Sequence, residues 1–167
     1  MNDPPHPAAL SLEALAAECE VRFTRRSGPG GQNRNKVETA VVLRHRPTGL
    51  GAAAAERRTQ GENLKAAYFR LRLNLALQVR RPVAPPSALW RSRCRGGRIV
   101  VSPEHDDFPA LLAEALGVLE ISEQDMKAAA AVLDCTPSQL TKLLKDEPRA
   151  MIQVNLARAG VGLGKLR

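Results

Sequence analysis

The sequence predicts an α+β fold, in which a small mixed sheet with packed helices is followed by a small all-α domain. Short segments between residues 20 and 45 alternate apolar and polar side chains, as half-buried strands do. A longer stretch over 60–79 then places apolar residues at helical spacing. The last third of the chain carries several helix start and stop signals. Because 44% of the 167 residues are hydrophobic, the chain can form a packed core, which argues against wholesale disorder.

The N-terminal residues predict a tail, a short helix and a strand. Residues 1–10 contain three prolines and are expected to form a disordered tail. A helix is expected over 11–18, with Ser11 as its N-cap. Residues 20–24 are expected to form a strand that turns Val21 and Phe23 toward the core.

Two further strands are predicted on either side of a turn at 47–49. Over 37–45 the pattern places Val41, Leu43 and His45 on one face of a strand. The Pro-Thr-Gly turn is followed by Gly and four alanines at 51–55, a composition that favours a helix. We expect a strand there nevertheless, because a turn directly after a strand favours a hairpin.

The predicted first domain, residues 11–80, ends with a helix over 60–79, which must stop before Pro82. Residues 81–105 are basic and rich in Pro and Gly, and we interpret them as a linker with one short strand at 99–101 and with Trp90 anchoring it on a domain. The remaining residues, 106–167, predict helices over 106–116 and 123–133, a capping-box start at Thr136 and a helix over 148–160. The apolar residues of the second part are enough for a small helical core: Leu133, Leu140, Leu143, Leu144, Ile152, Val154 and Leu156.

The segment 126–145 also resembles a helix-turn-helix, since an apolar helix, a short turn and a polar helix follow one another. On that interpretation its polar side chains contact phosphates or bases: Ser138, Gln139, Thr141, Lys142 and Lys145. Asp134 stands where such turns usually have Gly, and packing alone also explains the pattern. A DNA-binding regulator and a purely structural helical domain therefore both remain as interpretations of this segment.

Charge and composition narrow the class of partner. Residues 1–98 hold 18 Lys and Arg against 7 Asp and Glu, whereas residues 99–167 hold 7 against 10, which points to a polyanion bound by the first half. Aromatic residues make up only 3%, which argues against base stacking on single strands. Residues 1–20 lack Lys and Arg and no apolar run is long enough for a bilayer, so we expect no targeting peptide and no membrane partner.

Cysteine and histidine spacing gives no sign of a metal site or a cofactor. The three cysteines are far apart in the sequence, which is typical of reduced thiols in a cytoplasmic protein. The histidines, His6, His45 and His105, do not group with them at metal-ligand spacing. We therefore expect a protein without metal or cofactor.

The most informative motif is the Gly-Gly-Gln loop at residues 30–32. Gly30 and Gly31 free the backbone conformation and remove side chains, so a main-chain N–H can approach a reacting centre. The Gln32 amide has no titratable proton, which makes it a poor general base but a good group for positioning water. The alternative interpretation is that the Gly-Pro-Gly-Gly segment is only a flexible hairpin loop.

The residues around this loop resemble the signature of the catalytic domain of class I peptide chain release factors. The resemblance runs from Arg26 through Lys36 and continues with Thr39-Ala40-Val41, His45-Arg46-Pro47-Thr48-Gly49, Arg58-Thr59-Gln60, Asn63, Lys65 and Ala66. It covers about residues 18–80, with the motifs in the expected order. Two positions depart from the pattern: Arg34 replaces a small aliphatic residue, and Thr59 replaces the usual Ser.

The resemblance implies that the chain hydrolyses the ester of peptidyl-tRNA on the ribosome. Gly30, Gly31 and Gln32 are the implied catalytic residues, with the Gln32 N–H stabilising charge at the ester and its side chain holding water. The family's glutamine can be methylated on its amide, so a glutamine methyltransferase acting on Gln32 is a candidate partner. The residues expected to contact RNA surround the loop or approach it along the chain: Arg25, Arg26, Ser27, Asn33, Arg34, Asn35, Lys36, Arg57, Arg58, Gln60 and Lys65.

The size of the chain narrows the resemblance to the short, codon-independent relatives that rescue stalled ribosomes. The implied partners are the large-subunit rRNA and the P-site peptidyl-tRNA, and we expect a cytoplasmic monomer. Those relatives often end in a basic tail, for which the run from Arg91 to Arg98 is the nearest substitute here, unless that run is only a solvated linker. The alternative functions are a non-catalytic ribosome- or RNA-binding relative and, less favoured, a helix-turn-helix DNA-binding regulator.

Overall fold

The computed structural model describes residues 4–25, 38–81 and 85–167. The chain divides into two compact units, residues 7–75 and residues 1–6 together with 76–167. Both units contain helices and antiparallel strands, which confirms the α+β class. The division falls within a helix, a few residues before the predicted end of the first domain at residue 80.

The first unit begins with two short helices. Residues Pro7–Ala9 form a 3₁₀ helix, and both Pro7 and Ala8 are buried, so these residues belong to the folded unit and not to the predicted tail. Helix α1, Leu12–Ala17, has the predicted N-cap: the Ser11 hydroxyl accepts a hydrogen bond from the Ala14 N–H at 3.2 Å.

The sheet of this unit is antiparallel throughout and not mixed as predicted. Its strands are β1, Cys19–Thr24, β2, Ala40–His45, and β3, Gly51–Ala54, in the order β1-β2-β3. The alanine-rich segment is thus a strand, because the turn at Gly49, which has a φ of 74°, returns the chain alongside β2. The predicted inner face of β2 is confirmed by the full burial of its apolar side chains and of His45.

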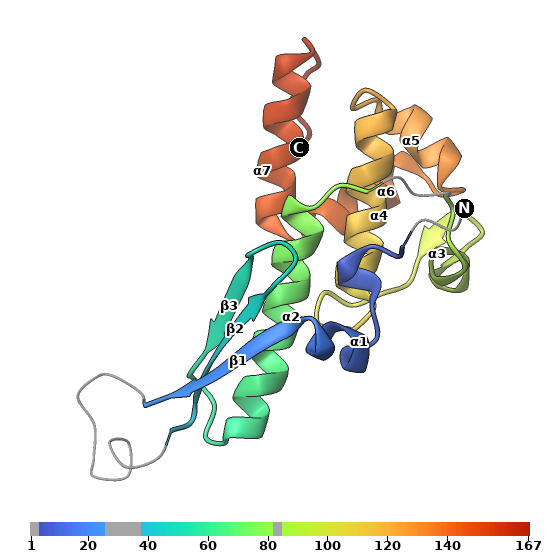
Figure 1. Ribbon diagram of the computed structural model, residues 1–167. Coiled ribbons are helices and arrows are strands. Elements are labelled where there is room, and N and C mark those ends of the chain that lie inside the picture. Colours follow the sequence, from blue (N-terminus) through green and yellow to red (C-terminus); the bar gives the residue numbers. More distant parts are fainter. Residues whose placement is uncertain (1–3, 26–37, 82–84) are drawn as a thin grey trace. The chain divides into compact units, whose positions relative to one another are not determined.

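Helix α2, Gln60–Gln78, lies along one face of the sheet, as Figure 1 shows. Its Arg70 and Asn74 side chains donate hydrogen bonds to the carbonyl oxygens of Ala53 and Gly51, both at 2.8 Å. The predicted inward side chains of β1 are only partly covered, since Val21 is 40% and Phe23 38% exposed. This strand forms an edge of the sheet, which explains the incomplete burial.

The second unit contains five helices and a β-hairpin among its described residues. In chain order they are α3, Ala88–Arg93, β4, Cys94–Arg95, β5, Arg98–Ile99, α4, Phe108–Ile121, α5, Met126–Val132, α6, Pro137–Lys145, and α7, Pro148–Gly160. Helix α4 is buried over most of its length and is the centre of the core. Within the described residues, no helix is both long enough and apolar enough to cross a membrane.

The predicted linker over 81–105 is largely folded. It forms α3 and the β4–β5 hairpin instead of a single short strand at 99–101. Trp90 is buried, as expected of an anchor, and its indole N–H donates a hydrogen bond to the Leu133 carbonyl at 2.7 Å. This part of the chain therefore belongs to the second unit.

The helices after the hairpin differ from prediction at several ends. Helix α4 continues to Ile121, and α5 begins at Met126, because Glu123 and Gln124 have positive φ and cannot continue a helix. Helix α7 begins and ends as predicted. Ile152 and Leu156 were expected in the core but are 61% and 69% exposed, whereas the other predicted core residues of this segment are buried.

Candidate functional site

The Gly-Gly-Gln motif lies in the segment that connects β1 to β2. Residues 26–37 are outside the described residues, so the roles assigned to nine of them stay predictions: Arg26, Ser27, Gly30, Gly31, Gln32, Asn33, Arg34, Asn35 and Lys36. The structure does describe where this segment begins and ends. Those flanking residues, and the elements that hold them, make up the frame of the candidate site.

Strand pairing brings the two flanks of the segment together. Thr24 at the end of β1 pairs with Ala40 at the start of β2. One residue further out, the Arg25 Nε lies 4.0 Å from the Glu38 carboxylate. Both side chains of that pair are more than half exposed, so the ion pair adds little stability. The backbone pairing of β1 with β2 therefore fixes where the chain leaves the sheet before the Gly-Gly-Gln segment and where it re-enters the sheet after it.

Asn63 connects this frame to helix α2 and is fully buried. Its Nδ2 donates hydrogen bonds to the Thr39 carbonyl at 2.7 Å and to the Arg57 carbonyl at 3.2 Å. Its Oδ1 accepts the Arg57 N–H at 2.9 Å. One amide thus holds the start of β2 and the residues before α2 at a fixed spacing, because a buried amide is stable only with its hydrogen bonds made.

The first turn of α2 makes a second connection to the frame. The Gln60 Nε2 donates a hydrogen bond to the Glu38 carbonyl at 3.0 Å. Thr59 and Glu62 form a reciprocal capping box, in which each side chain accepts the other residue's backbone N–H at 3.2 Å. The Thr59 hydroxyl also donates to the Glu62 carboxylate and lowers its pKa. Because threonine also caps through its hydroxyl, Thr59 retains the capping hydrogen bond at this departure from the signature.

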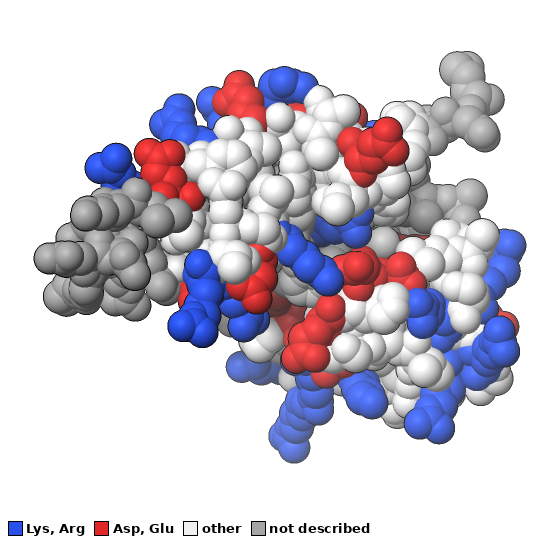
Figure 2. Space-filling model, turned by 90° about the horizontal axis from the view of Figure 1, so that it is seen from below, with Lys and Arg blue, Asp and Glu red and all other residues white. Residues whose placement is uncertain are grey.

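Three of the cations that are predicted to contact RNA lie near this frame. Arg57, Arg58 and Lys65 are exposed, and the described part of the chain offers them no carboxylate within ion-pair distance. Arg57 and Arg58 lie just before α2. Figure 2 shows Lys and Arg side chains in blue spread over this view of the molecule, with acidic side chains in red among them.

The nearby carboxylates are already engaged elsewhere. The Glu56 carboxylate accepts two hydrogen bonds from the Arg70 guanidinium, at 2.6 and 3.2 Å, and these hold its pKa at about 2. Glu62 is held in the capping box. The positive charge of Arg57 and Arg58 therefore remains available to phosphate groups.

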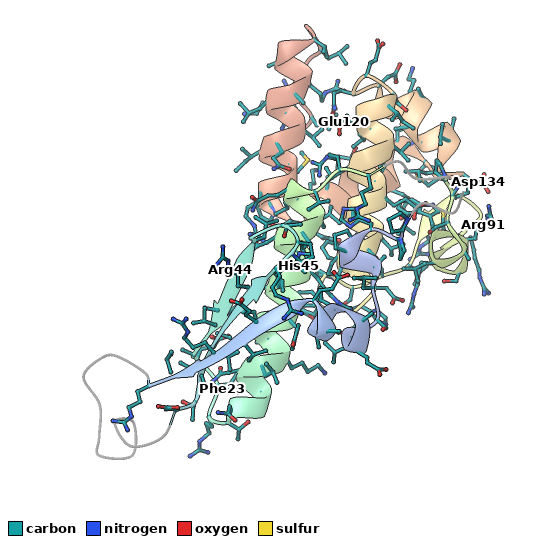
Figure 3. All side chains as sticks on the ribbon, viewed as in Figure 1. Phe23, Arg44, His45, Arg91, Glu120 and Asp134 are labelled. Carbon is teal, nitrogen blue, oxygen red and sulfur yellow. The ribbon has the colours of Figure 1, made fainter. Side chains whose placement is uncertain are left out.

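The His-Arg-Pro-Thr-Gly motif has a structural part in the fold. His45 is buried at the end of β2, with Nδ1 2.8 Å from the Thr48 hydroxyl and Nε2 2.8 Å from the Glu18 carboxylate. Figure 3 shows His45 and Phe23 toward opposite ends of the sheet, and Phe23 is on the strand that leads into the Gly-Gly-Gln segment. The motif thus stabilises the turn between β2 and β3 and is not part of the frame of the candidate site.

Asn63 holds the frame of the candidate site and is not among the site residues that the sequence predicts. It is one of the residues shared with the release factor signature. A single asparagine in the exposed first turn of an amphipathic helix gives no local sign of burial. Its partners are 24 and 6 residues away in the sequence, so only the folded structure brings them together.

Comparison with known proteins bears on the same part of the chain. Residues 10–92 match the RF-1 domain. Peptide chain release factor PrfB1, chloroplastic, from Arabidopsis thaliana is 43% identical over 67 residues, which cover 40% of this chain and 15% of that protein. Peptide chain release factor 1 from Acidiphilium cryptum (strain JF-5) is 38% identical over 87 residues, covering 52% of this chain and 25% of that protein. This chain therefore spans a quarter or less of these relatives' length.

Proposed function

Because residues 10–92 belong to the class I release factor catalytic domain family, we propose that this protein hydrolyses the peptidyl-tRNA ester on the ribosome. The observation that carries the proposal is that the strands and helix α2 hold the flanks of the same segment in which the sequence places the motif. The Gly-Gly-Gln motif occupies the connection between two paired strands, and Asn63 and Gln60 anchor the residues at its downstream end. Such a frame can present a motif at a defined place on a rigid sheet.

The chemistry is addition of water to the ester carbonyl carbon. The bond between that carbon and the ribose oxygen then breaks, which yields a free peptide carboxylate and a tRNA with a free hydroxyl. We assign to the Gln32 N–H the stabilisation of negative charge on the reacting oxygens, and to its side-chain amide the positioning of the water. Gly30 and Gly31 permit the backbone conformation that directs this N–H outward.

The proposed partners follow from the same assignment. The large-subunit rRNA and the P-site peptidyl-tRNA supply the remainder of the site, and the loop cations contact their phosphates and riboses. Arg25, Arg57, Arg58 and Lys65 contribute from the described frame, while Gln60 acts by holding Glu38. We further propose a cytoplasmic monomer, whose Gln32 is open to amide methylation.

The proposed peptide release does not require a stop codon. Within these 167 residues, the match to the RF-1 domain ends at residue 92, and the residues beyond it form a helical core built around α4. The matched residues include the Gly-Gly-Gln motif, and we propose that this motif releases peptide from stalled ribosomes without recognition of a stop codon.

One observation favours a second candidate, a relative that binds the ribosome without turnover. Arg34 stands two residues after the catalytic glutamine where the family has a small aliphatic side chain. A long cation at that place changes local packing or adds a phosphate contact. In the first case the protein would bind the ribosome but release peptide slowly.

A release assay separates the two candidates. Stalled ribosomes carrying labelled peptidyl-tRNA would be mixed with the wild-type protein, with Gln32→Ala and with Gly31→Ala. We expect the wild type to release peptide and Gly31→Ala to be slower by about 10²-fold or more, as when one oxyanion donor is misplaced. Undiminished release by Gly31→Ala would contradict the backbone argument, whereas ribosome binding without release by the wild type would favour the second candidate.

A further inference from the structure

The β4–β5 hairpin presents two arginines side by side. Arg95 and Arg98 are directly opposite each other in the antiparallel register, and both are exposed. Like charges at directly opposite positions of a strand pair oppose pairing of the strands. The Gly96-Gly97 turn between them has positive φ at both residues, which is the geometry of a tight two-residue hairpin. The fold therefore maintains an arrangement that is electrostatically unfavourable in the free protein.

This hairpin adjoins the start of helix α6. The Gly97 carbonyl accepts the Thr136 N–H at 3.0 Å, and the Ile99 N–H donates to the Gln139 Oε1 at 3.1 Å. Helix α6 has an exposed row at helical spacing that includes Lys142 and Lys145. The hairpin and this helix are thus two adjoining cationic elements of the same unit.

The cations of these elements lack acidic partners in the part of the chain that the structure describes. Elsewhere in this unit, arginines are paired with carboxylates, at Arg80–Glu120, Arg93–Asp107 and Arg149–Glu147. By contrast, five exposed cations have no such ion pair: Arg91, Arg95, Arg98, Lys142 and Lys145. Residues 76–98 carry six arginines and no Asp or Glu, whereas residues 99–167 carry 7 basic and 10 acidic residues, so the positive charge of this unit is concentrated in and before the hairpin.

Two of the polar groups that could read DNA bases are engaged within the protein. A recognition helix uses side chains near its start to contact base edges. Here the Gln139 Oε1 accepts the Ile99 N–H, and the Thr141 hydroxyl donates to the Pro137 carbonyl at 2.8 Å. The exposed lysines further along α6 suit phosphates, contacts that carry no sequence information.

We propose that the hairpin and helix α6 form a sequence-independent binding surface for the phosphate backbone of duplex RNA. The surface consists of Arg95 and Arg98 of the hairpin, Lys142 and Lys145 of α6, and Arg91 of the preceding helix α3. Its positive charge suits a nucleic acid backbone, and the choice of RNA over DNA rests on the proposed action at the ribosome. This assigns a partner to the unit that follows the release factor domain.

Asp134 is an acidic residue beside the start of helix α6. Asp134 lies in the turn just before α6, where its carbonyl accepts a hydrogen bond from the Cys94 thiol, and it is exposed. Figure 3 shows Arg91 and Asp134 at the same end of the unit. Its backbone has a φ of 51°, a conformation that asparagine also adopts readily. Asp134→Asn therefore removes a repulsive charge without disturbing the turn.

The test is binding of the full-length protein to a short fluorescent RNA duplex, followed by anisotropy over a range of KCl concentrations. We expect Arg95→Gln/Arg98→Gln to weaken binding about tenfold at moderate salt and to reduce the slope of log K against log salt by about 2. Lys165→Gln/Arg167→Gln removes the same charge from the exposed C-terminus and is expected to bind more tightly than the hairpin variant. Asp134→Asn is expected to tighten binding about twofold.

Fluorescence of the buried Trp90 verifies that each variant keeps the fold of this unit. Equal binding by the hairpin variant and the C-terminal control would overturn the proposal, and so would tighter, sequence-dependent binding of a DNA duplex. The outcome is independent of catalysis, because a plain RNA duplex carries no peptidyl ester for the protein to hydrolyse. If the wild-type protein failed to release peptide while the hairpin substitutions still weakened RNA binding, only the proposed catalytic function would be refuted.

Discussion

Replacement of Asn63 by alanine tests whether one buried amide holds the frame of the Gly-Gly-Gln segment. The substitution removes three hydrogen bonds, to the Thr39 carbonyl and to both backbone groups of Arg57. Alanine is a better helix former than asparagine, so helix propensity alone would make the variant more stable. Destabilisation would therefore come from the lost hydrogen bonds and the cavity.

The expected loss is about 2–4 kcal/mol in the free energy of unfolding of the first unit. Each net hydrogen bond contributes about 1 kcal/mol, and a buried group left without a partner costs about 1–3 kcal/mol more. Arg57 is exposed, so water can replace part of its lost bonding, which places the value below the full sum. For a unit of this size such a loss lowers Tm by roughly 10 °C or more.

Hydrogen exchange detected by mass spectrometry localises the effect, while far-UV circular dichroism gives the thermal transition. We expect faster exchange in peptides covering 38–63 for Asn63→Ala and little change in peptides covering 108–160. Lys65→Ala, an exposed substitution half a turn further along α2, is the matched control and is expected to behave as the wild type. Equal exchange in the two variants would refute the role given to Asn63.

Three further predictions concern stability and reactivity. Gly51→Ala is expected to lower Tm, since a Cβ there would lie 2.8 Å from the Leu43 carbonyl oxygen; an unchanged Tm would show that β3 can shift freely. Burial lowers the pKa of His6, whose Nε2 lies 3.1 Å from the Val79 carbonyl, below its ordinary 6.5. The contribution of neutral His6 to the free energy of unfolding should therefore be fully present above pH 6.5 and be lost on acidification. Urea titrations should show a smaller difference in the free energy of unfolding between pH 7 and pH 5 for His6→Gln than for the wild type. Burial raises the pKa of Cys135 to about 12, so its alkylation by iodoacetamide at pH 8 should be much slower in the folded than in the urea-unfolded protein, and equal rates would contradict its burial.

Sequence patterns predicted the first unit well because its structure follows from local signals. The Ser11 cap, the buried face of β2 and the long helix each repeat a short-range pattern that the structure confirms. At Gly51–Ala54 the hairpin context outweighed the helix preference of alanine. The sheet's antiparallel pairing follows from the short connections between consecutive strands.

The region from 81 to 105 could not be predicted, because long-range contacts stabilise it. The Ser87 N–H and hydroxyl donate to the buried Glu114 carboxylate at 2.7 and 2.5 Å, and Trp90 bonds to the Leu133 carbonyl 43 residues away. No local pattern of prolines, glycines and arginines contains these partners. The candidate site could also be predicted only in part. The Gly-Gly-Gln motif is evident in the sequence, but the role of Asn63 in its frame is recognised only from the contacts that Asn63 makes in the structure.

The most direct test of the central claim is peptide release by the wild-type protein on ribosomes that carry the same peptidyl-tRNA and differ only in the A site. One set would have a stop codon there, one a sense codon, and one no mRNA beyond the P site. We predict release from the ribosomes that lack a stop codon, with Gln32→Ala inactive on all three. Release that occurs only with a stop codon would contradict the proposed codon-independent function, and absence of release from every set would contradict the assignment of peptidyl-tRNA hydrolysis itself.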